Sequence, residues 1–353
     1  MNREETIDLI KRVSNNLKNT KNTSINEVCR IGIIDVENWE WAQGVGIFGL
    51  YTYAKKADDY EELGWIKNWI ENNMKKGLPP RNINTTAPML TVASIGIDEK
   101  NEKYLKLCND WAEWITNELP KTKFGGYQHI VSDGLNMQQL WDDTLFMTVL
   151  FMAKMGMITE NNNYLKQCEY QFLLHTQYLQ DRKTGLWYHG WTFDGNHNFA
   201  NALWGRGNCW ITAFITDYIE MTAGNCSIKD YMVSILNAQV EALEKCQSEC
   251  GLWHTLLNDK DSYLEVSATA GFAYGILKSI RMGILDKKYK PMALKAVKAV
   301  VDNIDGDGTV LNVSYGTGMG QTLQDYRDIP VCPMTYGQSM VIMMLAEVMN
   351  LQK

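Results

Sequence analysis

The stretch LWDDTLFM, residues 140–147, places two adjacent aspartates, Asp142 and Asp143, in an apolar run that continues through TVLFMAKMG. Burial disfavours the charged form of a carboxyl group and raises its pKa, and a like charge beside it raises the pKa further. Such a carboxylic acid can donate a proton near neutral pH. Because neighbours on a helix point about 100° apart, we expect one aspartate to be catalytic and the other structural. The alternative is that both cap a helix or form ion pairs.

The stretch WGRGNCW, residues 204–210, sets Arg206 between two glycines. Glycine lets the backbone approach another group closely. The planar guanidinium group of arginine binds both oxygens of a carboxylate. Arg206 is therefore predicted to bind an anionic group of a ligand, with a structural acid partner as the alternative.

Glycine-led segments recur at intervals of roughly 60 residues and carry aromatic and histidine side chains. They are GGYQHI from Gly125, GLWYHGW from Gly185, GLWHTLL from Gly251 and GTVLNV from Gly308. Aromatic rings stack on sugar rings, although each residue alone could equally be core packing. Their recurrence favours a shared sugar pocket that includes Tyr127, His129, Trp187, His189, Trp191, Trp253 and His254.

Helical periodicity dominates the chain, and alternating strand patterns are nearly absent. Some segments, such as 334–350, are apolar nearly all round and predict buried helices, whereas amphipathic ones, such as 101–118, predict an outer layer. A repeat of roughly 60 residues holds two helices, and about six repeats fit the chain. We therefore predict an all-α fold, an (α/α)6 barrel of six helical hairpins, as a single domain over residues 1–353. The predicted helices span residues 4–18, 39–56, 60–75, 101–118, 137–155, 160–180, 203–222, 229–247, 264–281, 288–303 and 334–350.

An early helix opens with ENWEWAQGVGIFGLY, residues 37–51. Glycines are poor helix formers, so the three in this segment, at positions 44, 46 and 49, predict tight helix packing. The tryptophans Trp39 and Trp41 are expected to line the pocket or to belong to the core.

Composition sets outer bounds on function. The chain has 353 residues, 45% hydrophobic, with a net charge of −7, which disfavours nucleic acid as a partner and requires a local cationic pocket for any anionic ligand. The N-terminus has no apolar stretch of signal-peptide type, and no run reaches transmembrane length. The eight cysteines, Cys29 among them, are scattered and form no CxxC pair. We expect a cytoplasmic protein with buried free thiols and neither zinc site nor cofactor.

In this order, WEWAQGVGIFGLY, LWDDTLFMTVLFMAKMG, GLWYHGW and WGRGNCW resemble segments of the unsaturated rhamnogalacturonyl hydrolases, glycoside hydrolase family 105. They are more distantly similar to the unsaturated glucuronyl hydrolases of family 88. A C-terminal segment, GMGQTLQDYRDIPVCPMTYGQSMVIMML, extends the likeness, which runs from about residue 37 to the C-terminus. The family fold is an (α/α)6 barrel, in agreement with the repeat.

The resemblance implies hydrolysis of a disaccharide whose uronic acid carries a C4=C5 double bond left by a polysaccharide lyase. An aspartate protonates C4 and assists attack of water at C5, and the resulting hemiketal collapses to release the neighbouring sugar. This is hydration of a vinyl ether, so the carboxylate spacing rule of ordinary glycosidases does not apply. Rhamnose as the second sugar is implied by the resemblance alone.

The resemblance assigns roles to individual residues. The catalytic aspartate of the family stands two residues after a tryptophan, which is Asp143 here. Asp142 occupies a position that is usually not acidic and either tunes Asp143 or faces elsewhere. Where relatives have an acid in a pattern like NID…P, this chain has NINTTAP, and Asn84 can bind a hydroxyl but cannot titrate. The implied substrate-binding residues are Trp41, Asn84, His129, Asp142, His189, Arg206 and Trp210.

Two other functions stay open. One is a sugar epimerase or isomerase of the same fold, in which His189 and His254 are acid and base. The other is a sugar-binding protein with a decayed site, for which Asn84 is the hint. In each case the expected partner is a small sugar, not nucleic acid or membrane, and the sequence does not set the oligomeric state.

Overall fold

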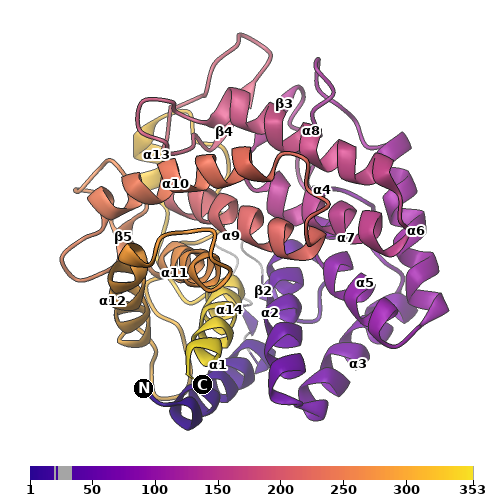
Figure 1. The fold of residues 1–353 in the computed structure, drawn as a ribbon, viewed down its shortest axis with the longest axis horizontal. Helices are drawn as coiled ribbons and strands as arrows, with labels where there is room; N and C mark the ends of the chain where they lie inside the picture. The colour runs from indigo at the N-terminus through magenta and orange to yellow at the C-terminus, as the bar shows by residue number, and fades with distance from the viewer. Residues whose placement is uncertain (20, 23–33, 353) are drawn as a thin grey trace.

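The computed structural model describes residues 1–19, 21–22 and 34–352 (Figure 1). Within these residues, twelve long helices alternate between an outer and an inner layer along the chain. The outer helices are α1 (Arg3–Asn19), α3 (Tyr60–Lys76), α6 (Glu102–Asn117), α8 (Asn162–Leu179), α10 (Lys229–Cys246) and α12 (Lys290–Val301). The inner helices are α2 (Trp41–Ala57), α5 (Met89–Asp98), α7 (Leu150–Ile158), α9 (Gly205–Thr222), α11 (Val266–Arg281) and α14 (Thr335–Leu351).

The inner helices form a closed ring. Each contacts the next in the order α2, α5, α7, α9, α11 and α14, and α14 returns to contact α2. The outer helices run around the periphery in Figure 1, and each packs on an inner helix: α3 on α2, α6 on α5, α8 on α7, α10 on α9, α12 on α11 and α1 on α14. The predicted all-α (α/α)6 barrel is confirmed.

Burial separates the two layers as the sequence patterns predict. In the inner helix α9, 16 of 18 residues are buried. In the outer helix α10, only 7 of 18 are buried, on one face. A helix with neighbours on all sides must be apolar or hydrogen-bonded all round, whereas an outer helix needs one apolar stripe. The predicted buried class of α14 and the amphipathic class of α6 are both confirmed.

The recurring glycine-led segments are turns that follow the outer helices. Gly125, Gly185, Gly251 and Gly308 all have positive φ, between 79° and 100°, a conformation that favours glycine. Three of them press on the backbone of the next outer helix. A Cβ on Gly185 would lie 2.6 Å from the carbonyl oxygen of Ala238 in α10, and one on Gly308 would overlap that of Arg12 in α1. The repeat therefore marks where one hairpin packs against the next.

The glycines of α2 permit the tight packing that was predicted for them. A Cβ on Gly44 would lie 2.6 Å from the backbone nitrogen of Pro88, which precedes α5. On the other side, a Cβ on Gly46 would meet Ser339 Oγ of α14 at 2.8 Å. Helix α2 therefore packs closely against both α14 and the start of α5.

The connections at the two ends of the barrel differ in length. From an inner helix to the next outer helix the connection is short, as at residues 58–59 and 159–161. From an outer helix to the next inner helix it is long, as at residues 118–144 and 302–334. The long connections contain most of the remaining elements. These include the helical turns α4 (Ile83–Thr86), η2 (Leu145–Val149, π-helical) and α13 (Leu323–Arg327), and the antiparallel pairs β3–β4 (Gln139–Trp141, Gly190–Thr192) and β5–β6 (Trp253–His254, Leu264–Glu265). Nearly all loop chain therefore gathers at one end.

Several described elements differ from the predicted ones. The predicted helix 137–155 starts late, because residues 139–141 form β3 and the two aspartates stand in the turn that follows. Helix α5 was not predicted, since its sequence MLTVASIGID is apolar almost throughout and lacks an amphipathic period. The short pair β1–β2 (Lys21–Asn22, Ile34–Asp35) and the turn η3 (Lys287–Tyr289) were also not predicted.

The barrel end opposite the long loops is closed by buried charges. Lys278 of α11 donates hydrogen bonds to Asp217 of α9 and to the hydroxyl of Tyr274. Nearby, Arg281 donates to Glu347 of α14 at 2.5 Å. Removing one partner from such a buried pair leaves an uncompensated charge, so this network holds three inner helices together.

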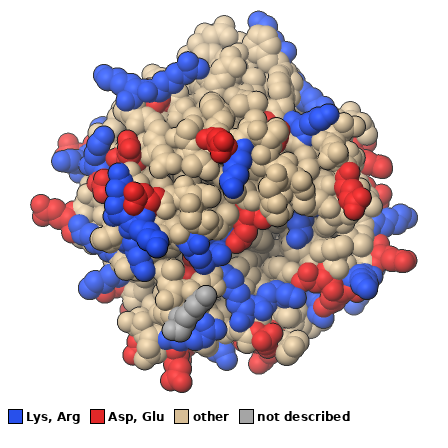
Figure 2. All heavy atoms as spheres, viewed as in Figure 1, with Lys and Arg blue, Asp and Glu red and all other residues tan. Residues whose placement is uncertain are grey.

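Thiols and surface charge give no sign of a further structural site. The cysteines in the described ranges are all free. Four of them are buried as expected, whereas Cys246 and Cys332 are partly exposed and Cys250 is exposed; Cys29 lies outside those ranges. None of the helices described is long and apolar enough to cross a membrane. Figure 2 shows positive and negative side chains mixed over the face in view.

Candidate active site

A narrow pocket opens among the long loops, where the N-terminal ends of inner helices converge. Trp41 begins α2, Asn84 belongs to α4, and Arg206 and Trp210 come from the first turns of α9. The loop that follows α6 supplies another wall. The full lining is Trp41, Asn84, His129, Val131, Asp133, Trp141, Asp143, Trp204, Arg206, Trp210 and Thr317.

Asp143 reaches this pocket from the turn between β3 and the π-helical turn η2. The backbone N–H of Asp142 donates to the carbonyl of His189 at 3.0 Å, which continues the β3–β4 pairing up to the turn. The Asp143 side chain is 16% exposed. Burial raises its pKa to about 7, against the opposing charge of Arg206. Asp143 is thus a carboxyl group that exchanges a proton near neutral pH.

Asp142 is fully buried behind the pocket. Its carboxyl group lies against Gly207, where any Cβ would overlap it, and neither of its oxygens has a hydrogen-bond partner among the described residues. Burial, and next the charge of Asp143, raise its pKa well above the usual value. Asp142 therefore stays protonated while Asp143 titrates, and the two aspartates occupy different environments.

Arg206 is a buried cation held by neutral groups. Its guanidinium lies 4.8 Å from the ring centre of Trp204 and 4.7 Å from that of Tyr336. It donates to Thr317 Oγ1 at 3.0 Å and to the hydroxyl and carbonyl of Ser314. Within the parts of the chain that the structure describes, no carboxylate pairs with it, and its Nε has no hydrogen-bond partner. The alternative of a structural acid partner is not found there.

His129 stands beside Asp143 as a neutral ring. Its Nδ1 lies 2.7 Å from Thr144 Oγ1 and 3.5 Å from Asp143 Oδ1, and its ring stacks on Trp141 with centres 4.2 Å apart. Burial lowers its pKa to about 3, with a smaller effect from His175. The ring therefore carries no charge at neutral pH and serves as a hydrogen-bonding wall beside the acid.

The structure divides the predicted site residues into two groups. Those that line the pocket are Trp41, Asn84, His129, Asp143, Arg206 and Trp210, while Asp142 and His189 lie behind it. His189 is 2% exposed and packs against Trp204, with its Nδ1 2.7 Å from the hydroxyl of Tyr326. Most other repeat-loop residues are core packing: Tyr127, Trp187 and Trp253 are at most 1% exposed.

The sequence reasoning missed five pocket residues. Trp141 and Trp204 stand inside the motifs already quoted, one residue before Asp142 and two residues before Arg206, so their position was the available signal. Val131, Asp133 and Thr317 come from loops without periodicity. Trp41 stacks on Tyr336 at 4.7 Å and meets Trp210 edge-on at 6.4 Å, so aromatic rings form much of the wall.

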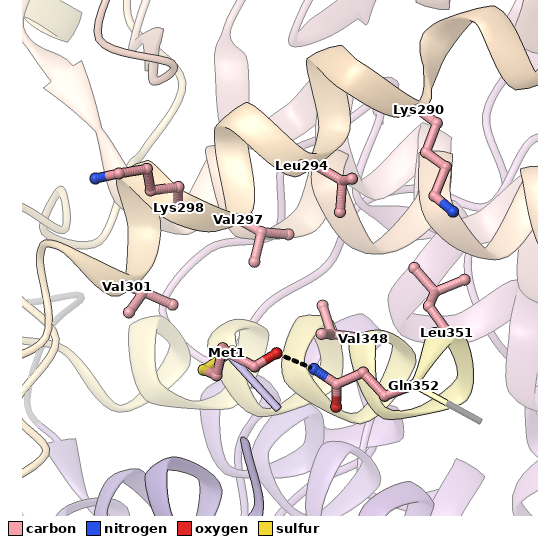
Figure 3. Close-up of a pocket in the computed structure, with 9 residues that line it drawn as sticks. All are labelled: Met1, Lys290, Leu294, Val297, Lys298, Val301, Val348, Leu351 and Gln352. Atoms are coloured by element: carbon pink, nitrogen blue, oxygen red, sulfur yellow. Dashed lines mark hydrogen bonds between the residues drawn. The ribbon is translucent and has the colours of Figure 1, made fainter. Parts of the chain in front are cut away.

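A larger hollow of about 490 Å³ lies at the other end of the barrel, between α12 and α14 (Figure 3). Its walls are mainly Leu294, Val297, Val301, Val348 and Leu351, with Lys290 and Lys298 at the edge. Its lining contains no acid or histidine, so it lacks the paired acid and cation of the narrow pocket. Among the described residues, no group of three or more His, Cys, Asp or Glu side chains could hold a metal ion.

Residues 9–352 match the model of Glycosyl Hydrolase Family 88. The chain belongs to this family. The resemblance drawn from the motif order is thereby confirmed, and the chain is a glycoside hydrolase.

Relatives of known name support the family assignment. The unsaturated rhamnogalacturonyl hydrolase YesR of Bacillus subtilis (strain 168) is 32% identical over 321 residues, which cover 89% of this chain and 91% of that protein. A crystal structure described as a possible member of family 105, from Klebsiella pneumoniae, is 43% identical with a TM-score of 0.96, over 100% of this chain and 95% of that one. A similar structure from Salmonella enterica is 44% identical with a TM-score of 0.95, over 100% and 96%.

Proposed function

We propose that this family 88 protein hydrolyses disaccharides that carry an unsaturated uronic acid, with the unsaturated rhamnogalacturonan disaccharide as the favoured substrate, and that residues 1–353 form one catalytic domain. The observation that carries the proposal is the pairing, in one narrow pocket, of Asp143, an acid with a pKa of about 7, and Arg206, a buried cation without a carboxylate partner. The name of the Bacillus subtilis relative supports this substrate class. A cytoplasmic location remains a prediction.

Arg206 provides the place for the uronate carboxylate. A buried charge is costly unless it is paired, and the carboxylate of a uronic acid would supply the negative charge that the neutral hydrogen-bond partners of Arg206 lack. The aromatic rings of Trp41, Trp204 and Trp210 provide flat apolar surfaces against which a sugar ring can lie. Asn84 provides an amide for a sugar hydroxyl. The pocket thus suits an anionic sugar.

Asp143 carries out the chemical steps. The protonated carboxyl group delivers its proton to C4 of the C4=C5 bond while water adds at C5, and the carboxylate formed accepts the proton that the water loses. The hemiketal at C5 then opens to a ketone, and the bond from C1 to the neighbouring sugar breaks. Asp143 ends the cycle protonated, so no other acid is consumed.

Bound substrate favours the acid form of Asp143. The positive charge of Arg206 lowers the pKa of Asp143 in the free protein. When a carboxylate binds Arg206, this effect is offset, and the pKa of Asp143 rises because a negative charge has entered the pocket. The substrate thereby helps to keep its own proton donor protonated.

The test is to mix the protein with lyase-generated unsaturated rhamnogalacturonan disaccharide and follow the ultraviolet absorbance of the conjugated C4=C5 bond. We expect absorbance to fall with the wild type and to stay constant with Asp143→Asn, whose fold is checked by circular dichroism. Full turnover by Asp143→Asn refutes the assignment of the proton donor. Saturable binding without product indicates a sugar-binding protein instead.

The epimerase alternative loses its structural basis. It requires two histidines that face one substrate. His189 is buried behind Trp204, and His254 neither belongs to the described pocket lining nor forms a hydrogen bond with it. Instead, His254 Nδ1 contacts the carbonyl of Ser262. Interconversion of a reducing sugar that is lost in His254→Ala is the result that would restore this alternative.

A further inference from the structure

A tight hairpin at the pocket mouth holds one carboxylate in place. Val131 and Gly134 pair through their backbones, so Ser132 and Asp133 form the tip. The tip is anchored twice: Ser132 donates to Glu40, the residue that caps α2, and Asn82, which caps α4, donates to Ser132 at 3.2 Å. Asp133 is exposed and lines the pocket.

The charges of the pocket are arranged by depth. At the floor, Arg206 is 1% exposed, and at the mouth stands the exposed Asp133. Among the lining residues in the described ranges, Arg206 supplies the sole positive charge. Glu40 adds a second carboxyl group behind Asp133, and its pKa is raised mainly by burial and in part by the charge of Asp133. The field is therefore positive at the floor and negative at the mouth.

We propose that Asp133 determines which leaving sugar the pocket accepts: it selects a neutral sugar and rejects one that carries sulfate or carboxylate. The inference rests on the proposed function, which places the uronate carboxylate at Arg206 on the floor. The second sugar then lies toward the mouth, where Asp133 accepts hydrogen bonds from its hydroxyls. Among the lining residues that the structure describes, a sulfate at this position meets carboxylates and no nearby cation, and like charges in close contact lower affinity strongly.

The experiment compares two unsaturated disaccharides that differ by one sulfate: the unsulfated chondroitin disaccharide made by a lyase and its form sulfated on the hexosamine. Initial rates give kcat/KM for each substrate with the wild type, Asp133→Asn and Asp133→Lys. Glu61→Gln is the matched control, because it removes one negative charge from an exposed position in the first turn of α3, at the opposite end of the barrel. The unsaturated rhamnogalacturonan disaccharide serves as the reference substrate.

We expect the wild type to prefer the unsulfated disaccharide by about tenfold or more, a typical effect of one unfavourable charge contact. Asp133→Asn should reduce this preference to near unity, and Asp133→Lys should reverse it. The preference of Glu61→Gln should equal that of the wild type. The effect of Asp133 should also weaken at high salt, since the mouth is open to solvent.

Two failures are distinguishable. Where a chondroitin disaccharide is not cleaved, its inhibition constant against the reference substrate gives the preference instead of kcat/KM. If the wild type cleaves the reference substrate but the preference is the same in wild type, Asp133→Asn and Glu61→Gln, Asp133 does not determine specificity while the proposed function stands. If the wild type cleaves none of the three substrates, the proposed function is wrong and the inference falls with it. The fold of each variant is checked by circular dichroism.

Discussion

The pKa of Asp143 predicts how the rate depends on pH. A proton donor must be protonated in the free enzyme, and kcat/KM reports that state. With a pKa of about 7, the protonated fraction of Asp143 is about one half at pH 7, about one eleventh at pH 8 and about one hundredth at pH 9. The value of kcat/KM should therefore fall about fivefold from pH 7 to pH 8 and about ninefold from pH 8 to pH 9.

The variant Asp142→Asn tests the reasoning behind that value. Because Asp142 remains protonated when Asp143 ionises, replacing its neutral carboxyl group by a neutral amide changes no charge. The pH above which kcat/KM of the variant falls should stay within about half a pH unit of that of the wild type. By contrast, bound substrate offsets Arg206, so the limb of kcat should lie at higher pH than the limb of kcat/KM.

The assay is the initial loss of C4=C5 absorbance in overlapping buffers from about pH 5 to 9. The buffers have constant ionic strength, and substrate concentration is varied at each pH. A limb that moves down by a full unit in Asp142→Asn would show that the charge of Asp142 raises the pKa of Asp143. A wild-type kcat/KM that does not decline up to pH 9 would refute the assignment of Asp143 as the proton donor.

Three predictions concern stability. Because its pKa is raised in the native state, Asp143 holds its proton more tightly in the folded protein than in the unfolded chain, and its contribution to stability falls as pH rises from about 4 to 7. Asp143→Asn should therefore stabilise the folded protein by about 2–3 kcal/mol more at pH 8 than at pH 5. Urea unfolding at the two pH values measures this difference. Gly207→Ala should lower the free energy of unfolding by about 1–3 kcal/mol and remove much of the activity, because its Cβ displaces Asp142. The control Gly64→Ala, whose Cβ meets open space in α3, should raise the melting temperature. Equal melting temperatures of the two variants would refute the contact between Gly207 and Asp142. Lys278→Met should lower the free energy of unfolding by about 3–5 kcal/mol, because it leaves a buried carboxylate unpaired. The kcat of the folded variant should be unchanged. A chemical denaturation curve identical to that of the wild type would contradict the role of this network.

The ring could be predicted because its signals are repeated. Inner and outer helices differ in burial all along the chain, and each glycine turn at the start of a loop has the same backbone requirement for positive φ. Helix α5 was not predicted because a short, uniformly apolar segment has no helical period to detect. The late start of the helix after Asp143 was equally invisible, since β3 needs a partner strand, β4, that lies some 50 residues onward in the sequence.

The site was predicted in part, for a different reason. Arg206 and Asp143 stand out because charged residues in apolar runs need an explanation. Which of Asp142 and Asp143 faces the pocket depends on the turn conformation, and residue type alone does not encode it. His189 and Trp187 share their types with true pocket residues but face the interior. Asp133 lies in a loop whose position is set by contacts with Glu40 and Asn82, both distant in sequence.

The glycine-lined face of α2 has a consequence for how the protein is made. The helix that fits against Gly46 is α14, whose Ser339 lies at the far end of the chain. During synthesis on the ribosome, α2 emerges early, and until α14 follows its glycine-lined face can contact Leu17 of α1 but not Ser339. Contacts of such large sequence separation form late and slowly, and a nascent chain with exposed apolar faces is prone to aggregation. We therefore expect the chain to depend most on chaperones in the interval before α14 packs against α2 and closes the ring.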